Sequence, residues 1–170
     1  MFQLKPLSQE AVPAALEKAH RYRLLNEPLE AESICRDVLA IHPGHQLALR
    51  ILGLALTDRF EGMSGALFGE AQEVFARLED PYERAFYEGL ACERQAKAQL
   101  AARLPLASIR TLFDQALAHY AEAERLRPPG NDDPILRWNS CVRALQAAPD
   151  CGRPDTPVVD WDTDFVPHRR

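Results

Sequence analysis

Apolar and small residues recur at helical spacing along most of this chain. The clearest stretch has a small residue at Ala116, an aromatic residue at Tyr120, a second small residue at Ala123 and a proline at Pro128. Residues four and seven apart share one face of a helix, the alanines allow a neighbouring helix to approach closely, and proline ends a helix. The pattern predicts a helix that is buried along one face and ends before Pro128.

The same pattern occurs twice more. It reads Ala31, Cys35, Val38 and Pro43 in a first unit, and Ala71, Phe75 and Leu78 in a second unit, where Pro81 comes two residues early. Each unit also has an earlier stretch that combines small and large residues at helical spacing. The packing residues are Ala19 with Tyr22, then Leu52 and Gly53 with Leu56, then Gly89 with Cys92, and finally Trp138 with Cys141, Val142 and Leu145. The last of these helices has no partner after it and is expected to cap the array.

The spacing of these units resembles the tetratricopeptide repeat family, abbreviated TPR. Ala19 precedes Ala31 by 12 positions and Ala31 precedes Gly53 by 22, which together make the 34-residue period of that family. The resemblance extends from about Val12 to Leu145. It implies an all-α fold, a right-handed stack of antiparallel helix pairs (an α-solenoid) with about three enlarged repeats and a capping helix. The pattern departs from the family at Lys18 and Glu88, where a large apolar residue is usual.

Two units are longer than the family period. Six extra residues fall near 59–65, whose glycines and serine predict a loop. Fifteen more occupy 97–113, where apolar residues keep a helical rhythm, so two antiparallel helices should each be longer by about 10 Å. We expect a helical hairpin that protrudes from the stack and leaves Leu100, Leu104 and Leu106 exposed unless something covers them. A homodimer through this 97–113 hairpin is one hypothesis.

The composition of the chain changes after Gln146. Residues 1–148 are expected to form the helical domain, whereas residues 149–170 are rich in proline and aspartate and should be an extended or disordered tail. Trp161 and Phe165 stand four apart in this tail among aspartates. They are candidate anchors for a partner protein, or they cover apolar surface of the chain's own domain.

Composition narrows the function further. A length of 170 residues suits one domain, and a formal charge of −5 without a basic cluster argues against nucleic acid as a partner. Arg50 interrupts the most apolar stretch, and no N-terminal signal is apparent, so we expect no membrane insertion and a cytoplasmic, bacterial-type protein. The four cysteines lie far apart, which suits a reducing compartment better than a zinc site or a disulfide framework.

The chain has no recognisable catalytic motif, and we expect no catalytic residue, cofactor or metal site. His42 and His45 flank a Pro-Gly turn, which a helix end explains without a metal. Asp132 and Asp133 precede Pro134 and are interpreted as helix-capping residues. A reactive, low-pKa cysteine at Cys92 or Cys141 would instead favour an enzyme with an unrecognised site.

The TPR resemblance also implies a concave groove lined by the first helix of each pair. By spacing, the groove residues are Leu16, His20 and Arg23, then Arg50, Leu54 and Thr57, then Phe86, Leu90 and Glu93, and finally Asn139 and Arg143 in the cap. Apolar residues with several arginines suit a peptide that buries a few side chains and presents an acidic group. The carboxylate clamp of chaperone-binding adaptors is not expected, because Leu16, His20 and Ile51 stand in its places.

The sequence therefore predicts an adaptor or scaffold that binds a peptide or partner protein. Two alternatives remain open from the sequence. One is a secretion chaperone of the three-repeat class, which the size and acidity resemble, although the long third hairpin departs from that class. The other is a non-catalytic subunit of an enzyme complex.

Overall fold

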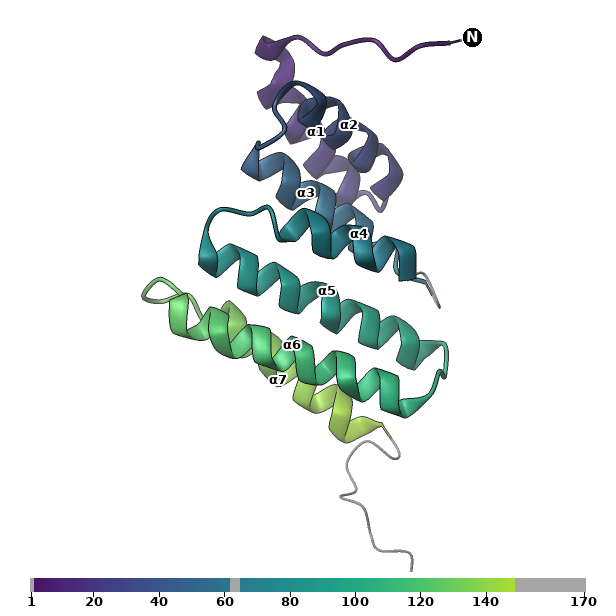
Figure 1. The fold of residues 1–170 in the computed structure, drawn as a ribbon, viewed down its shortest axis with the longest axis vertical. Helices are drawn as coiled ribbons and strands as arrows, with labels where there is room; N and C mark the ends of the chain where they lie inside the picture. The colour runs from purple at the N-terminus through teal and green to yellow at the C-terminus, as the bar shows by residue number, and fades with distance from the viewer. Residues whose placement is uncertain (1, 62–64, 149–170) are drawn as a thin grey trace, which may run out of the picture.

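The regular structure of the described chain is helical. The computed structural model describes residues 2–61 and 65–148, and within these ranges it contains helices and no strand. A 3-10 turn at Gln9–Ala11 precedes α1 (Val12–Leu24), α2 (Pro28–Ile41), α3 (Gln46–Thr57), α4 (Gly65–Phe75), α5 (Pro81–Ala101), α6 (Leu106–Leu126) and α7 (Asp133–Ala147). The all-α prediction is confirmed (Figure 1).

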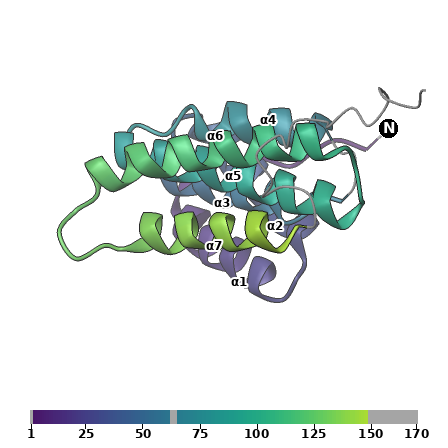
Figure 2. The same cartoon turned by 90° about the horizontal axis from the view of Figure 1, so that it is seen from below.

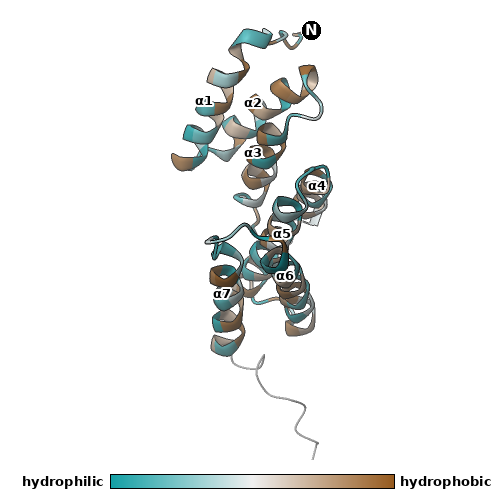
Figure 3. Cartoon of the chain, turned by 90° about the vertical axis from the view of Figure 1, so that its left-hand side faces the viewer, coloured by the Kyte–Doolittle hydropathy of each residue, from teal (hydrophilic) through white to brown (hydrophobic). Residues whose placement is uncertain are grey.

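Each helix packs against the next one along the chain, and the odd-numbered helices α1, α3, α5 and α7 also contact one another in order. In Figure 2, α4 and α6 lie on one side of α3 and α5, whereas α1 and α7 lie on the other. Figure 3 shows the same arrangement from the side, with α1 and α7 both lying to the left of α5. The odd-numbered helices therefore form one continuous face, with its middle set back from its two ends.

Prolines and polar side chains start these helices. Proline occupies the first turn of α1, α2, α5 and α7, where its missing N–H is not needed. The Asp80 carboxylate accepts a hydrogen bond from the Tyr82 N–H at 2.8 Å and caps α5, and the His45 ring caps α3 by accepting from the Ala48 N–H at 3.4 Å. The helix start at Pro134 agrees with the prediction, whereas Pro81, interpreted as the proline that ends the second unit, lies in the first turn of α5.

The predicted capping of α7 needs a correction. Neither Asp132 nor Asp133 caps it through a side chain; instead the Asn131 side-chain oxygen accepts from the Asp133 N–H at 3.0 Å. Asp132 is drawn away because its carboxylate pairs with Arg127. A charged partner close by outcompetes the backbone N–H groups for this carboxylate.

The repeated small and aromatic residues form the interior. All nine signature residues of the second helices, Ala31, Cys35, Val38, Ala71, Phe75, Leu78, Ala116, Tyr120 and Ala123, are at most 1% exposed. Their partners from the first helices are mostly buried too, but Trp138 is 37% exposed and lies outside the α7 interface, contrary to the prediction. Cys141 is fully buried and makes that contact instead.

The third unit is lengthened as expected, but its leucines are less exposed than predicted. The helices α5 and α6 have 21 residues each, whereas α1 to α4 have 11 to 14. Leu100 and Leu106 are half-buried against the cluster that contains Ile109 and Phe113, and Leu104 is also half-buried. The two helices cover these side chains because they pack along each other over their full length. A homodimer through 97–113 stays a prediction.

Several predicted features fall at or beyond the limits of the described chain. Residues 58–61 after α3 are non-helical, in agreement with the predicted loop, and 62–64 lie outside the described residues. The helical domain is described to Ala148. Cys151, Trp161 and Phe165 also lie outside the described residues. Among the helices that are described, none combines the length and the apolar character needed to cross a membrane.

A glycine at the α3–α4 contact provides a test of the packing. A Cβ atom at Gly53 would lie 2.2 to 2.7 Å from atoms of the buried Phe75 ring, whereas a Cβ at Gly69 in α4 would meet nothing within 4 Å. We predict that Gly53→Ala lowers the free energy of unfolding by about 1 to 3 kcal/mol through overpacking. Gly69→Ala is expected to raise it by about 0.5 to 1 kcal/mol, as the usual gain in a helix interior. Urea denaturation compares the two, and equal midpoints would contradict the close approach.

Candidate functional site

The face made by the odd-numbered helices carries two hollows. The α1/α3 hollow has a volume of about 530 Å³ and is lined by Val12, Pro13, Leu16, Glu17, His20, His45, Leu47 and Ile51. The α5/α7 hollow has a volume of about 480 Å³ and is lined by Leu54 of α3, by Phe86, Tyr87, Leu90 and Arg94 of α5, and by Asp133, Leu136, Arg137 and Ser140 of α7. Sites for small ligands or anchoring side chains have volumes of this order.

The sequence prediction located five residues that line these hollows. Leu16 and His20 contribute to the α1/α3 hollow, and Leu54, Phe86 and Leu90 contribute to the α5/α7 hollow. Leu16 and Leu90 are each only 3% exposed, so they form the floor of a hollow. The five belong to α1, α3 and α5, the first helices of the predicted pairs.

Two of the three predicted arginines, Arg23 and Arg50, are paired within the chain and are not free for a partner's carboxylate. The Arg23 Nε donates to Asp58 Oδ2 at 2.7 Å, and Arg50 pairs with Glu83. Arg143 is exposed, as is Asn139, and neither lines a hollow. Recognition of an acidic group by Arg23 or Arg50 would require breaking an existing ion pair.

Thr57 and Glu93 are corrections to the predicted groove, because both side chains are buried. Thr57 is 3% exposed, and its hydroxyl donates to the Leu54 carbonyl at 2.8 Å and accepts from Arg94 at 2.7 Å. Glu93 is 1% exposed. The helical spacing placed both residues on the correct helices, but polar neighbours from other helices draw them inward.

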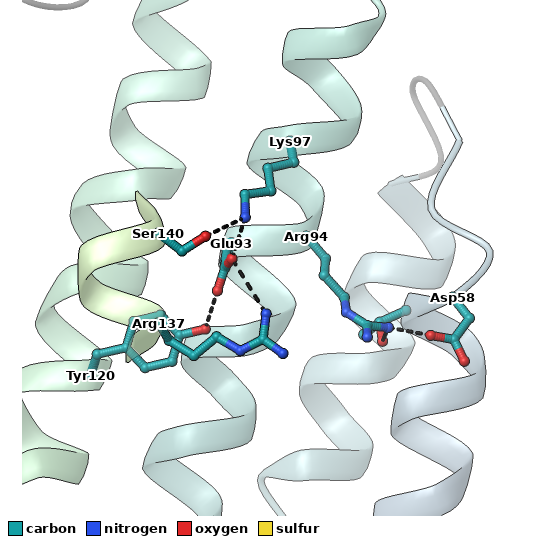
Figure 4. Close-up of polar contacts among 8 residues, drawn as sticks. Asp58, Glu93, Arg94, Lys97, Tyr120, Arg137 and Ser140 are labelled. Carbon is teal, nitrogen blue, oxygen red and sulfur yellow. Dashed lines mark hydrogen bonds and ion pairs between the residues drawn. The ribbon is translucent and has the colours of Figure 1, made fainter. Parts of the chain in front are cut away.

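Glu93 is the centre of a polar cluster that joins three helices (Figure 4). The Tyr120 hydroxyl of α6 donates to Glu93 Oε2 at 2.6 Å, and the Lys97 ammonium donates to Glu93 Oε1 at 2.5 Å. Lys97 also donates to the Ser140 hydroxyl of α7 at 2.9 Å, and Arg137 of α7 lies 3.7 Å from the carboxylate. A buried carboxylate requires such donors, so this cluster fixes α7 against α5 and α6.

A second polar cluster centres on Asp58, just after α3. Its carboxylate accepts from Arg23 of α1 and from Arg94 of α5, and the Arg94 guanidinium also bonds to Thr57. Figure 4 shows Arg94 reaching across to Asp58 from α5. The sequence analysis missed both Asp58 and Arg94, because partners 35 and 36 positions apart leave no local signal.

The described residues hold no group of three or more His, Cys, Asp or Glu side chains positioned to bind a metal ion. His42 and His45 have ring centroids 6.3 Å apart beside the turn at Pro43 and Gly44. Because His45 caps α3 through its Nδ1, one of the two rings already has a structural role.

The three cysteines in the described part of the chain do not have the environment of a nucleophile. Cys35, Cys92 and Cys141 are buried and free. Burial raises the pKa of the Cys35 and Cys141 thiols to about 12 and that of Cys92 to about 11, and the nearby Glu88 adds to the effect at Cys92. A reactive thiolate requires the opposite shift, so the observation that would have favoured a cysteine enzyme is not found at these positions.

Thiol reactivity tests this interpretation. In a Cys151→Ser variant, we predict that the three remaining cysteines react slowly with iodoacetamide in the folded protein at neutral pH and rapidly after unfolding in urea. Burial blocks access, and the raised pKa values keep the thiolate fraction very small. Mass spectrometry identifies each modified position. Fast modification of Cys92 or Cys141 in the folded protein would contradict the prediction and favour the enzyme alternative.

The Glu93 cluster generates a prediction for stability. Tyr120→Phe should lower the free energy of unfolding by about 1.5 to 3 kcal/mol at neutral pH, the usual range for a hydrogen bond to a charged group.

Burial and the adjacent Glu93 raise the pKa of Tyr120 in the folded state. As the pH rises through about 10, the Tyr120 hydroxyl therefore loses its proton in the unfolded state but keeps it in the folded state. This difference lowers the free energy of unfolding above that pH. The variant should lack this part of the alkaline decline, and urea denaturation at neutral and alkaline pH measures both effects. An identical decline in the two proteins would contradict the coupling.

Comparison with known proteins adds no assignment to this geometry: no protein-family model matches the chain, and searches of curated proteins and of solved structures find no match.

Proposed function

We propose that this protein is a TPR-like adaptor that holds a peptide segment of a partner protein on its odd-helix face, the surface formed by α1, α3, α5 and α7. The α5/α7 hollow carries the proposal, because it combines an apolar floor with cationic and exposed apolar groups at its edge. The lengthened pair α5 and α6 is interpreted as the enlarged third repeat, and α7 as the cap.

Periodic polar contacts support the repeat interpretation. Arg23 bonds to Asp58 across 35 positions, Arg36 to Glu70 across 34, Arg50 to Glu83 across 33, Arg77 to the Pro43 carbonyl across 34, and Gln46 to the Glu79 N–H across 33. Equivalent positions of successive repeats lie about one period apart, and the period of the TPR family is 34 residues. Contacts at nearly constant separation are expected when like units stack on one another.

The α5/α7 hollow is suited to an anchoring side chain from a peptide. Phe86 and Leu90 offer apolar surface, and Leu136 on the α7 side is 64% exposed, so its side chain is accessible to a bound segment. Covering such a residue with an apolar side chain removes apolar surface from water at about 25 cal/mol per Å². The structure thus has a place where a few side chains could contribute much of the binding energy.

The charged groups at this hollow favour an acidic segment. Arg94 and Arg137 line it together with a single carboxylate, Asp133. Arg94 is paired with Asp58, but the Arg137 side chain is 42% exposed and lies 3.7 Å from the Glu93 carboxylate. Arg137 therefore has donors to offer a carboxylate on the bound peptide.

Substitution of exposed leucines tests which surface binds. We predict that full-length protein captures a partner from extract of its native cell, and that Leu136→Glu or Leu47→Glu, each at the edge of a hollow, weakens the capture at least tenfold. Leu29→Glu on α2 is the matched control, since Leu29 is 60% exposed and lies on an even-numbered helix. Capture is quantified by mass spectrometry. Loss on Leu29→Glu alone would move the site to the α1–α2 turn, and no captured partner would reject the adaptor function.

A further inference from the structure

We propose that residues 158–166 of this same chain bind in the α5/α7 hollow and compete there with the partner segment. This inference rests on the proposed function and adds a mode of regulation to it: residues 158–166 occupy the hollow until a partner with higher affinity displaces them. The occupant is inferred from three observations, which concern the chemistry of the hollow, the chemistry of the segment and its reach.

The hollow offers two kinds of recognition side by side. Its apolar residues, including Leu54, Phe86 and Leu90, can receive large side chains, and the exposed Leu136 can cover them from the α7 side. Of the cations at this hollow, Arg94 is paired with Asp58 and Lys97 with Glu93, whereas the Arg137 side chain is 42% exposed and lies 3.7 Å from Glu93. The fitting ligand is therefore an aromatic or aliphatic segment that carries negative charge.

Residues 158–166 have this composition. The segment reads Val-Val-Asp-Trp-Asp-Thr-Asp-Phe-Val, with three aspartates and no cation. In an extended peptide, alternate side chains point to opposite sides. Trp161 and Phe165 would then share one side, and the three carboxylates would share the other. Such a segment can place aromatic rings against Phe86 and Leu90 and still direct carboxylates toward the arginines at the edge.

The connecting chain is long enough for this contact within one molecule. Trp161 is 13 residues beyond Ala148, and the residues between them include three prolines. A proline-rich linker spans about 3.1 Å per residue, which gives a reach of about 40 Å. The hollow lies closer than that, because Leu136 is 11 residues before the end of α7 and a helix rises about 1.5 Å per residue, or about 17 Å in all.

Charge adds a further contribution along α7. Arg137 and Arg143 both lie on this helix, and both are at least partly exposed. A segment that returns from the end of α7 toward the hollow would pass near these cations. Its affinity should therefore decrease with added salt, as expected for exposed charges that attract each other in water.

The intrinsic fluorescence of Trp161 tests the proposal in the full-length protein without any partner. A Trp138→Phe background leaves Trp161 as the only tryptophan, and Trp138 is not among the residues that line the hollow. We expect a blue-shifted emission that acrylamide quenches weakly. Leu136→Glu should shift the emission to that of an indole in water and raise the quenching, whereas the control Leu29→Glu should leave both unchanged.

A second set of variants changes only the tail and so cannot unfold the helical body. Replacing Asp160, Asp162 and Asp164 together by asparagine should weaken the shielding of Trp161 and remove its dependence on salt. Circular dichroism confirms that the helices are retained in every variant.

Three results would overturn the proposal. The first is a Trp161 emission typical of an indole in water while the hollow is unaltered. The second is an equal response to Leu136→Glu and Leu29→Glu. The third is a shielding of Trp161 that disappears on dilution, which would assign the occupant to the tail of a second copy. Because these measurements use the chain alone, the tail can fail to bind while the adaptor function stands. Conversely, a shielded Trp161 in a protein that captures no partner would reject the adaptor function alone.

Discussion

The close approach of a first-helix glycine to a second-helix aromatic ring sets the spacing of the paired helices in this structure. At Gly53 the Phe75 ring fills the space that a Cβ atom would need, and at Gly89 the Tyr120 ring and the His119 Cβ lie about 3.0 to 3.1 Å from that position. Close-packed interiors have little spare volume, so these two contacts limit how the paired helices can be positioned. The remaining signature residues are small or aliphatic and are also buried.

Tyr120 connects this packing constraint to the polar interior. Its ring packs against Gly89, and its hydroxyl donates to the buried Glu93 carboxylate, which in turn attracts Lys97 and Arg137. A buried carboxylate without its donors would cost several kcal/mol, so the position of α7 depends on this cluster as well as on apolar contact. The α5/α7 hollow depends on it too, because two of its lining residues, Arg137 and Ser140, are linked to Glu93 or Lys97.

The distribution of charge shapes the proposed binding face. Ion pairs such as Arg23–Asp58 and Arg50–Glu83 cross between successive odd-numbered helices and hold the face together. Partly exposed ion pairs usually contribute little stability each. An arginine that is held in such a pair is nevertheless not available to bind a ligand. The proposed site is therefore concentrated near α7, where the partly exposed Arg137 lies next to apolar surface.

The sequence by itself determined the helical class and the interior residues of each helix pair, because residues four and seven positions apart lie on the same face of a helix. It also predicted the helix start at Pro134 and the greater length of α5 and α6. Only the tertiary structure decided that Glu93 and Thr57 turn inward, that Trp138 lies outside, that Asn131 rather than an aspartate caps α7, and that Arg23 and Arg50 are paired. The physical reason is that the position of a polar side chain depends on its strongest hydrogen-bond or ion-pair partner. Glu93, Thr57, Arg23 and Arg50 each have a partner that is distant in the sequence, up to 37 positions away for Thr57 and Arg94, and no local pattern predicts such a partner. Asn131 caps α7 because its competitor Asp132 pairs with Arg127.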